Sequence, residues 1–93
     1  MTKALFPLGQ IVATPGALSA LGHEGIGSEA ILQRHVTGDW GELSDDDRRE
    51  NELSIKEGFR ILSAYKLART GVKLWIITEA DRSATTLLLP DEY

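Results

Sequence analysis

The sequence predicts an α+β fold, in which an N-terminal short strand and two to three helices pack on a three- to four-stranded antiparallel meander. Between residues 14 and 58, three candidate cap residues each precede a stretch that ends at a glycine, which predicts three helices. From Phe59 onward the apolar residues alternate with a period of two, over three runs separated by short turns. Because the helices come first and the strands follow, we expect the helices to cover one face of the sheet.

The 93 residues suffice for a single domain, which we divide into an N-terminal arm (1–8), a helical part (9–58) and an antiparallel sheet (59–90). The chain contains no cysteine, which excludes disulfides, thiolate metal sites and cysteine nucleophiles. Its apolar runs are far shorter than a membrane span, and its N-terminus lacks the apolar stretch of a secretory signal. We therefore expect a soluble cytoplasmic protein that does not enter a membrane.

The helical part begins with a strand and a well-marked helix start. Residues 9–13 are apolar and β-branched, which predicts a short strand. Thr14 is a suitable N-cap, and Pro15 fits the first helical position, where its missing N–H costs nothing. We expect this helix to stop at Gly22, because glycine readily ends a helix.

Two further helices follow. Ser28 is the expected cap of the second helix, which stops at Gly38, and Ser44 is the expected cap of the third, which ends at Gly58. Few apolar residues of the third helix share a face, so it is either mostly solvated or buries polar groups deliberately. Its first turn is acidic, which suits the positive end of the helix dipole, and contains Asp45, Asp46 and Asp47.

The alternating part of the chain predicts three strands. They cover residues 60–67, 73–80 and 84–89, and the turns between them cover 68–72 and 81–83. Two consecutive hairpins of this kind form an antiparallel meander. In the first strand, alternation places four side chains on one face: Ile61, Ser63, Tyr65 and Leu67.

Charge is divided unevenly along the chain. The net charge of −4 conceals eight acids and three bases in residues 39–57, and two acids and five bases in residues 58–90. An acidic stretch of −5 thus precedes a basic one of +3. Either the two parts attract each other, or an acidic helix and a basic sheet face are available to a partner.

Three residues are candidates for catalysis. His35 ends a predicted helix, where a cation is favoured, and could act as a general base. Arg60 opens the first meander strand, and Thr78 supplies a hydroxyl on the next. If they converge, they suit metal-free phosphodiester cleavage, with His35 taking the 2′-hydroxyl proton and Arg60 holding the phosphate. Alternatively, His35 bonds a backbone carbonyl and has a structural role.

Other residues are candidates for binding a partner. Trp40, between Asp39 and Gly41, is either a plug over the helix junction or an exposed stacking and interface residue. Asp81 and Arg82 either form a local turn pair or belong to a site. The binding candidates are Trp40, Asp45, Asp46, Asp47, Asn51, Ser63, Tyr65, Asp81, Arg82 and Thr85.

We expect no metal and no cofactor. The two histidines lie far apart in the sequence, and neither a His-x-x-x-His motif nor a calcium-binding loop is present. The glycines of residues 22–27 lack the lysine and hydroxyl residue that complete a phosphate-binding loop.

Three runs, RHVTGDWG (34–41), LSAY (62–65) and WIITEADRSATT (75–86), resemble a family of small bacterial proteins labelled plasmid-related. The similarity covers nearly the whole chain and implies a mobile-element setting, but no activity. In its layout of helices followed by a sheet, the chain also resembles small ribonucleases of the barnase, colicin-nuclease and RelE types. That likeness implies His35 as the base, Arg60 as the anion holder, and Thr78 or Thr85 as a hydroxyl contact.

Two functions from different classes follow from these observations. The first is an interaction protein of mobile-element type, which binds a protein or nucleic-acid-processing partner through its acidic helix or its basic sheet face. The alternative is a metal-independent, ribonuclease-like enzyme. A third possibility is a structural or regulatory subunit that forms a homodimer through a sheet edge or an exposed Trp40. The discriminating observation is whether His35, Arg60, Ser63 and Thr78 share a solvent-open pocket.

Overall fold

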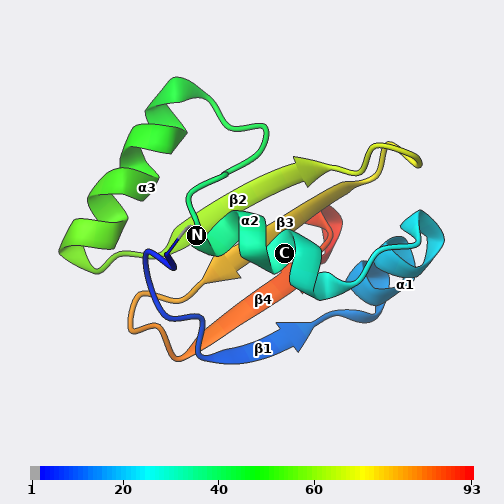
Figure 1. The fold of residues 1–93 in the computed structure, drawn as a ribbon, viewed down its shortest axis with the longest axis horizontal. Helices are drawn as coiled ribbons and strands as arrows, with labels where there is room; N and C mark the ends of the chain where they lie inside the picture. Colours follow the sequence, from blue (N-terminus) through cyan, green and yellow to red (C-terminus); the bar gives the residue numbers. More distant parts are fainter. Residues whose placement is uncertain (1–2) are drawn as a thin grey trace.

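The computed structural model describes residues 3–93 and has the expected α+β architecture (Figure 1). The elements before the meander are β1 (Gln10–Ala13), α1 (Pro15–Glu24), α2 (Ser28–Val36) and α3 (Asp45–Glu57). They are followed by β2 (Ile61–Lys66), β3 (Lys73–Thr78), β4 (Ala84–Leu88) and a short 3₁₀ helix, η1 (Pro90–Glu92). None of the helices within residues 3–93 has the length and apolarity needed to cross a membrane.

The sheet has the strand order β1-β4-β3-β2 and is mixed (Figure 1). β2, β3 and β4 form the predicted antiparallel meander. β1 pairs with β4 in parallel, with Ile11 opposite Thr85, so the expectation of a purely antiparallel sheet is wrong. The three helices and two of the meander strands separate β1 from β4 in sequence. No short turn therefore forces the two strands to run in opposite directions.

The helix boundaries follow the cap chemistry, with two corrections. The Thr14 hydroxyl caps α1 as predicted, by accepting from the backbone N–H of Ala17 at 3.1 Å. α1 continues past Gly22, because the left-handed residue that ends it is Gly25, at φ 79°. Ser28 is the first residue of α2 and does not cap it, since Gly27 occupies the N-cap position.

The core lies between the sheet and the helices α1 and α2. The side chains of Tyr65, Leu74, Ile76 and Leu87 are almost completely buried there, on the sheet face that α2 covers. A smaller cluster closes one end of this core and contains Trp40, which is 2% exposed and stacks on Phe6. The interpretation of Trp40 as a plug is therefore confirmed.

α3 does not cover the sheet but lies beside its β2 edge (Figure 1). The helix buries two polar side chains, Asn51 and Ser54, which explains why its sequence has no apolar face. The Asn51 amide bonds both backbone groups of Leu62: its nitrogen donates to the carbonyl at 2.6 Å, and its oxygen accepts from the N–H at 3.2 Å. A single side chain thus forms the two hydrogen bonds that a neighbouring strand would otherwise form with Leu62.

The segment before α3 bonds the backbone groups of Ala64, the next residue of β2 whose N–H and C=O point away from β3. The Ala64 N–H donates to the Trp40 carbonyl at 3.1 Å, and the Glu42 N–H donates to the Ala64 carbonyl at 2.6 Å. Gly41 lies so close that a Cβ built on it would be 2.1 Å from the Ala64 oxygen, and its φ is 76°. Only glycine fits this position, which is the structural reason for the glycine that directly follows Trp40.

No ion pair within residues 3–93 joins the acidic part (39–57) to the basic part (58–90). Within residues 3–93 the ion pairs are Arg34–Asp39 and Arg49–Asp46, both short-range. Arg82, at φ 60°, donates to the carbonyls of Phe59 and Ser54, at the C-terminal end of α3. The guanidinium thereby fixes the β3–β4 turn to the negative end of the α3 dipole.

We predict that Asn51→Ala lowers the free energy of unfolding by about 2 kcal/mol, because it leaves both backbone groups of Leu62 without their partner. Lys56→Ala, an exposed change on the same helix, should alter it by less than about 0.5 kcal/mol. Urea denaturation followed by circular dichroism measures both values. Equal stability of the two variants would show that the Asn51 amide does not hold the β2 edge.

Candidate functional site

His35 lies at the centre of a buried chain of hydrogen bonds that spans three strands. It is 0% exposed, with Nδ1 2.5 Å from Ser63 Oγ on β2 and Nε2 2.9 Å from Thr78 Oγ1 on β3. Thr78 Oγ1 is 2.7 Å from Thr85 Oγ1 on β4. The Thr85 hydroxyl in turn donates to the Leu8 carbonyl at 2.7 Å, so the chain joins α2 to the segment before β1.

The Leu8 carbonyl, at the end of this chain, determines which group donates in each hydrogen bond between Thr85 and His35. A carbonyl can only accept, so Thr85 donates to Leu8 and must accept from Thr78. The Thr78 oxygen then accepts from His35 Nε2, which carries the ring hydrogen. Nδ1 accepts from the Ser63 hydroxyl. Because burial lowers the pKa of His35 to about 4, the ring is neutral at pH 7 and is the Nε2–H tautomer, with both ring nitrogens satisfied.

The catalytic candidates do not meet in one open pocket. Ser63 and Thr78 both contact His35, but all three side chains are 0% exposed. Burial lowers the pKa of His35 to about 4, which makes the ring a weak base at neutral pH. Arg60 is exposed, and its guanidinium donates to the Tyr93 hydroxyl at 2.9 Å, outside the buried chain. This arrangement is structural and does not favour phosphodiester cleavage.

Several binding candidates also have structural roles. The Tyr65 hydroxyl donates to the Asp39 carbonyl at 2.7 Å, and burial raises the pKa of Tyr65 to about 12. The Asp81 carboxylate accepts from the Ser83 N–H at 3.0 Å, so Asp81 shapes the β3–β4 turn. Asp45 and Asp46 are exposed on α3.

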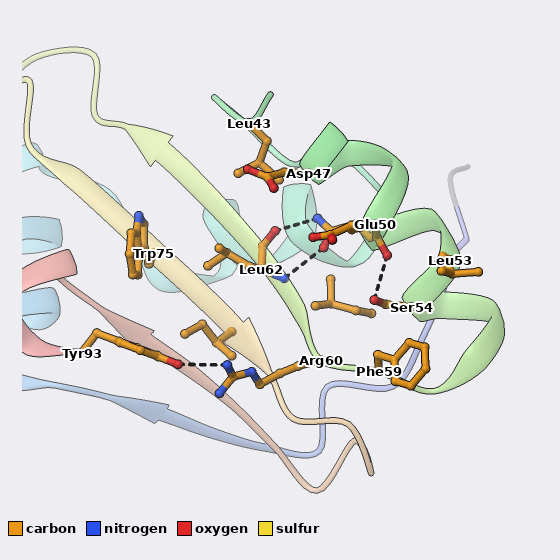
Figure 2. A pocket seen from close by; sticks show the side chains of 13 residues that line it. Leu43, Asp47, Glu50, Leu53, Ser54, Phe59, Arg60, Leu62, Trp75 and Tyr93 are labelled. Carbon is orange, nitrogen blue, oxygen red and sulfur yellow. Dashed lines mark hydrogen bonds between the residues drawn. The ribbon is translucent and has the colours of Figure 1, made fainter. Parts of the chain in front are cut away.

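A groove of about 610 Å³ lies between α3 and the sheet face that α2 leaves uncovered (Figure 2). Its floor consists of Leu62, Trp75 and Ile77, which alternation directs away from α2. α3 forms one wall, which includes Asp47 and Glu50 (Figure 2). The remaining lining residues are Leu43, Asn51, Leu53, Ser54, Phe59, Arg60, Ile61 and Tyr93.

The groove has an apolar floor and charged sides. Leu53 and Phe59 expose more than half of their surface at its margin, at 51% and 56%. Asp47 and Glu50 belong to neither of the two ion pairs within residues 3–93. On the opposite side, Arg60 is held by the Tyr93 hydroxyl (Figure 2). The groove therefore combines an acidic helix, an apolar floor and one positioned cation.

Of the residues singled out from the sequence, Asp47, Asn51 and Arg60 line this groove. The floor residues were not singled out, although the sequence carries a signal for them. β3 is apolar on both faces, with Trp75 and Ile77 on the second, which is more than one layer of helices can cover.

Comparisons of the chain with known protein families, curated proteins and solved structures found no match. The function is therefore argued from the geometry of the site. Within residues 3–93, no three side chains of the metal-binding types His, Asp and Glu gather where they could hold a metal ion.

We predict that the free energy of unfolding falls by about 3 kcal/mol as the pH is lowered from about 7 to about 4. The unfolded chain binds a proton at His35 below its ordinary pKa of 6.5, whereas the folded chain binds it only near pH 4. The stabilisation is therefore complete above 6.5 and lost as the pH falls through this window. Denaturant titrations at several pH values measure the change.

Hydrogen bonds to Arg34, to the Arg69 N–H and to Thr14 lower the pKa values of Asp39, Glu24 and Glu92 from 3.8, 4.5 and 4.5. Their stabilisation is therefore lost only at the acidic end of this window and below it. His35→Gln should remove most of the slope, and His23→Gln, at an exposed position in the last helical turn of α1, should keep it. Ring-nitrogen NMR of the unchanged protein gives an independent readout. A hydrogen on Nδ1 at neutral pH would contradict the proposed chain.

Proposed function

We propose that this protein is an interaction protein whose groove, between α3 and the sheet, binds a segment of another protein with apolar and basic side chains. The observation that supports this function is the apolar groove floor of Leu62, Trp75 and Ile77, on the sheet face opposite α2 and beside an acidic wall. A concave, largely apolar site with a few polar groups at its sides is where proteins commonly bind a ligand or a partner segment.

The dimensions of the groove suit a short segment. Its volume of about 610 Å³ lies within the range of sites that enclose a few side chains. Trp75 is half-buried in the floor and is flanked by Arg60 and Tyr93. Tryptophan, arginine and tyrosine are the residue types that contribute most to the affinity of protein interfaces. The apolar floor would supply most of the affinity, and the acidic wall would select a basic segment and orient it.

The acidic side is favoured over the basic sheet half as the binding surface, because the arginines of that half are engaged within the protein. Arg82 donates to carbonyls at the end of α3, and Arg69 donates to the His23 carbonyl. Arg60 bonds Tyr93 inside the groove. These contacts disperse the positive charge instead of gathering it into the continuous basic face that a nucleic-acid backbone requires.

We predict that a short synthetic peptide of alternating leucine and lysine binds the groove, and that the same peptide with glutamate in place of lysine does not. Binding should change the fluorescence of Trp75, which lies half-buried in the floor, while Trp40 is 2% exposed and shielded. Trp75→Phe should abolish the fluorescence change. Amide chemical shifts should move for α3, β2 and β3.

A pair of matched variants tests the acidic wall. Asp47→Asn should weaken binding of the leucine–lysine peptide by about three- to fivefold, the magnitude typical of one exposed charge pair. Asp45→Asn removes the same charge from the same helical turn, but Asp45 does not line the groove, so affinity should stay within about twofold. Equal effects, or equal binding of both peptides, would contradict the proposed function.

A further inference from the structure

The two edges of the sheet differ in how their backbone groups are satisfied. At the β2 edge, the Asn51 amide and the backbone of residues 40–42 bond Leu62 and Ala64. β1 forms the opposite edge, the lowest strand in Figure 1, and β4 is its neighbour on the inner side. No other strand of residues 3–93 pairs with it. One edge is thus capped and the other is open.

The hydrogen bonds to β4 show which backbone groups of β1 face outward. The Gln10 N–H donates to the Ser83 carbonyl at 2.9 Å, and the Thr14 N–H donates to the Leu87 carbonyl at 3.0 Å. Because the direction alternates along a strand, the N–H and C=O groups of Ile11 and Ala13 point away from β4. These are the groups that another strand would bond.

The side chains of β1 lack the usual protection of an open edge. Proteins commonly place lysine or another charged residue on an exposed edge strand, but Gln10–Ala13 contains no charge. Instead, Ile11 is 44% exposed and Val12 is 42% exposed. A second, smaller hollow of about 210 Å³ adjoins Ile11 and is lined partly by Leu8, Leu32 and Val36.

We infer that the β1 edge pairs antiparallel with β1 of a second copy of this chain, about a twofold axis that passes beside Val12. In this register Ile11 lies opposite Ala13 of the second copy, and each such pair exchanges both of its outward backbone hydrogen bonds. On the face covered by α2, a large side chain meets a small one. On the uncovered face, the two Val12 side chains meet at the axis.

A second copy fits this edge better than an unrelated strand, because β1 is complementary to itself in that register. The two residues with outward groups, Ile11 and Ala13, are equidistant from Val12, so the twofold leaves none of these groups unpaired. The edge lies across the sheet from β2 and α3, so pairing leaves the groove accessible. The inference is therefore independent of the proposed peptide binding.

Sedimentation equilibrium over rising protein concentration tests the inference. The mass should rise from 10.2 kDa to twice that value. Val12→Lys places two cations opposite each other at the axis and should weaken association at least about tenfold. Leu18→Lys, at a 58% exposed position on α1, should leave association unchanged. A wild-type protein that stays at 10.2 kDa at millimolar concentration would overturn the inference.

Hydrogen exchange separates this interface from any other dimer. The Ile11 and Ala13 amides should be protected at high protein concentration and lose that protection on dilution or in Val12→Lys. Ala13→Pro removes one outward donor while leaving the inward bonds of Gln10 and Thr14 in place, and should also weaken association. A dimer in which both amides exchange freely would show that another surface is used.

Discussion

The buried chain of hydrogen bonds through His35 is the constraint on which the rest of the structure depends. Its members come from α2, all three strands of the meander and the segment before β1. In a low-dielectric interior each hydroxyl must keep its partner, because an orphaned polar group there is costly. The chain therefore fixes α2 over one face of the sheet and fixes its register against β2, β3 and β4 at once.

The placement of α2 explains why the opposite sheet face is uncovered. α1 and α2 share their apolar residues with the core on one side, and α3 contributes an amide to the backbone of β2 instead of an apolar face to the sheet. α3 consequently lies beside the sheet, and the space between them becomes the groove. The polar residues Asn51 and Ser54 thus determine the position of the apolar floor.

The sequence predicts the helix caps and the meander strands, but it does not predict which distant segments pair with each other. Rules that act within a few residues predict the caps Thr14 and Ser44, the end of α3 at Gly58 and the three meander strands. The parallel pairing of β1 was missed, because alternation shows which face a side chain takes but not which strand lies beside it. The burial of His35 depends on partners 28 and 43 residues away.

The capped β2 edge also bears on aggregation. A sheet with two open edges is a template that can add strands in both directions, which is how cross-β fibres grow. Asn51, Gly41 and their neighbours close one of these directions with groups that belong to the folded domain. In the twofold pair that we propose, strand addition at β1 is terminal, because the pair uses the open edge of both molecules and presents the capped β2 edges outward. The domain can carry an apolar edge strand without becoming the repeating unit of a fibre.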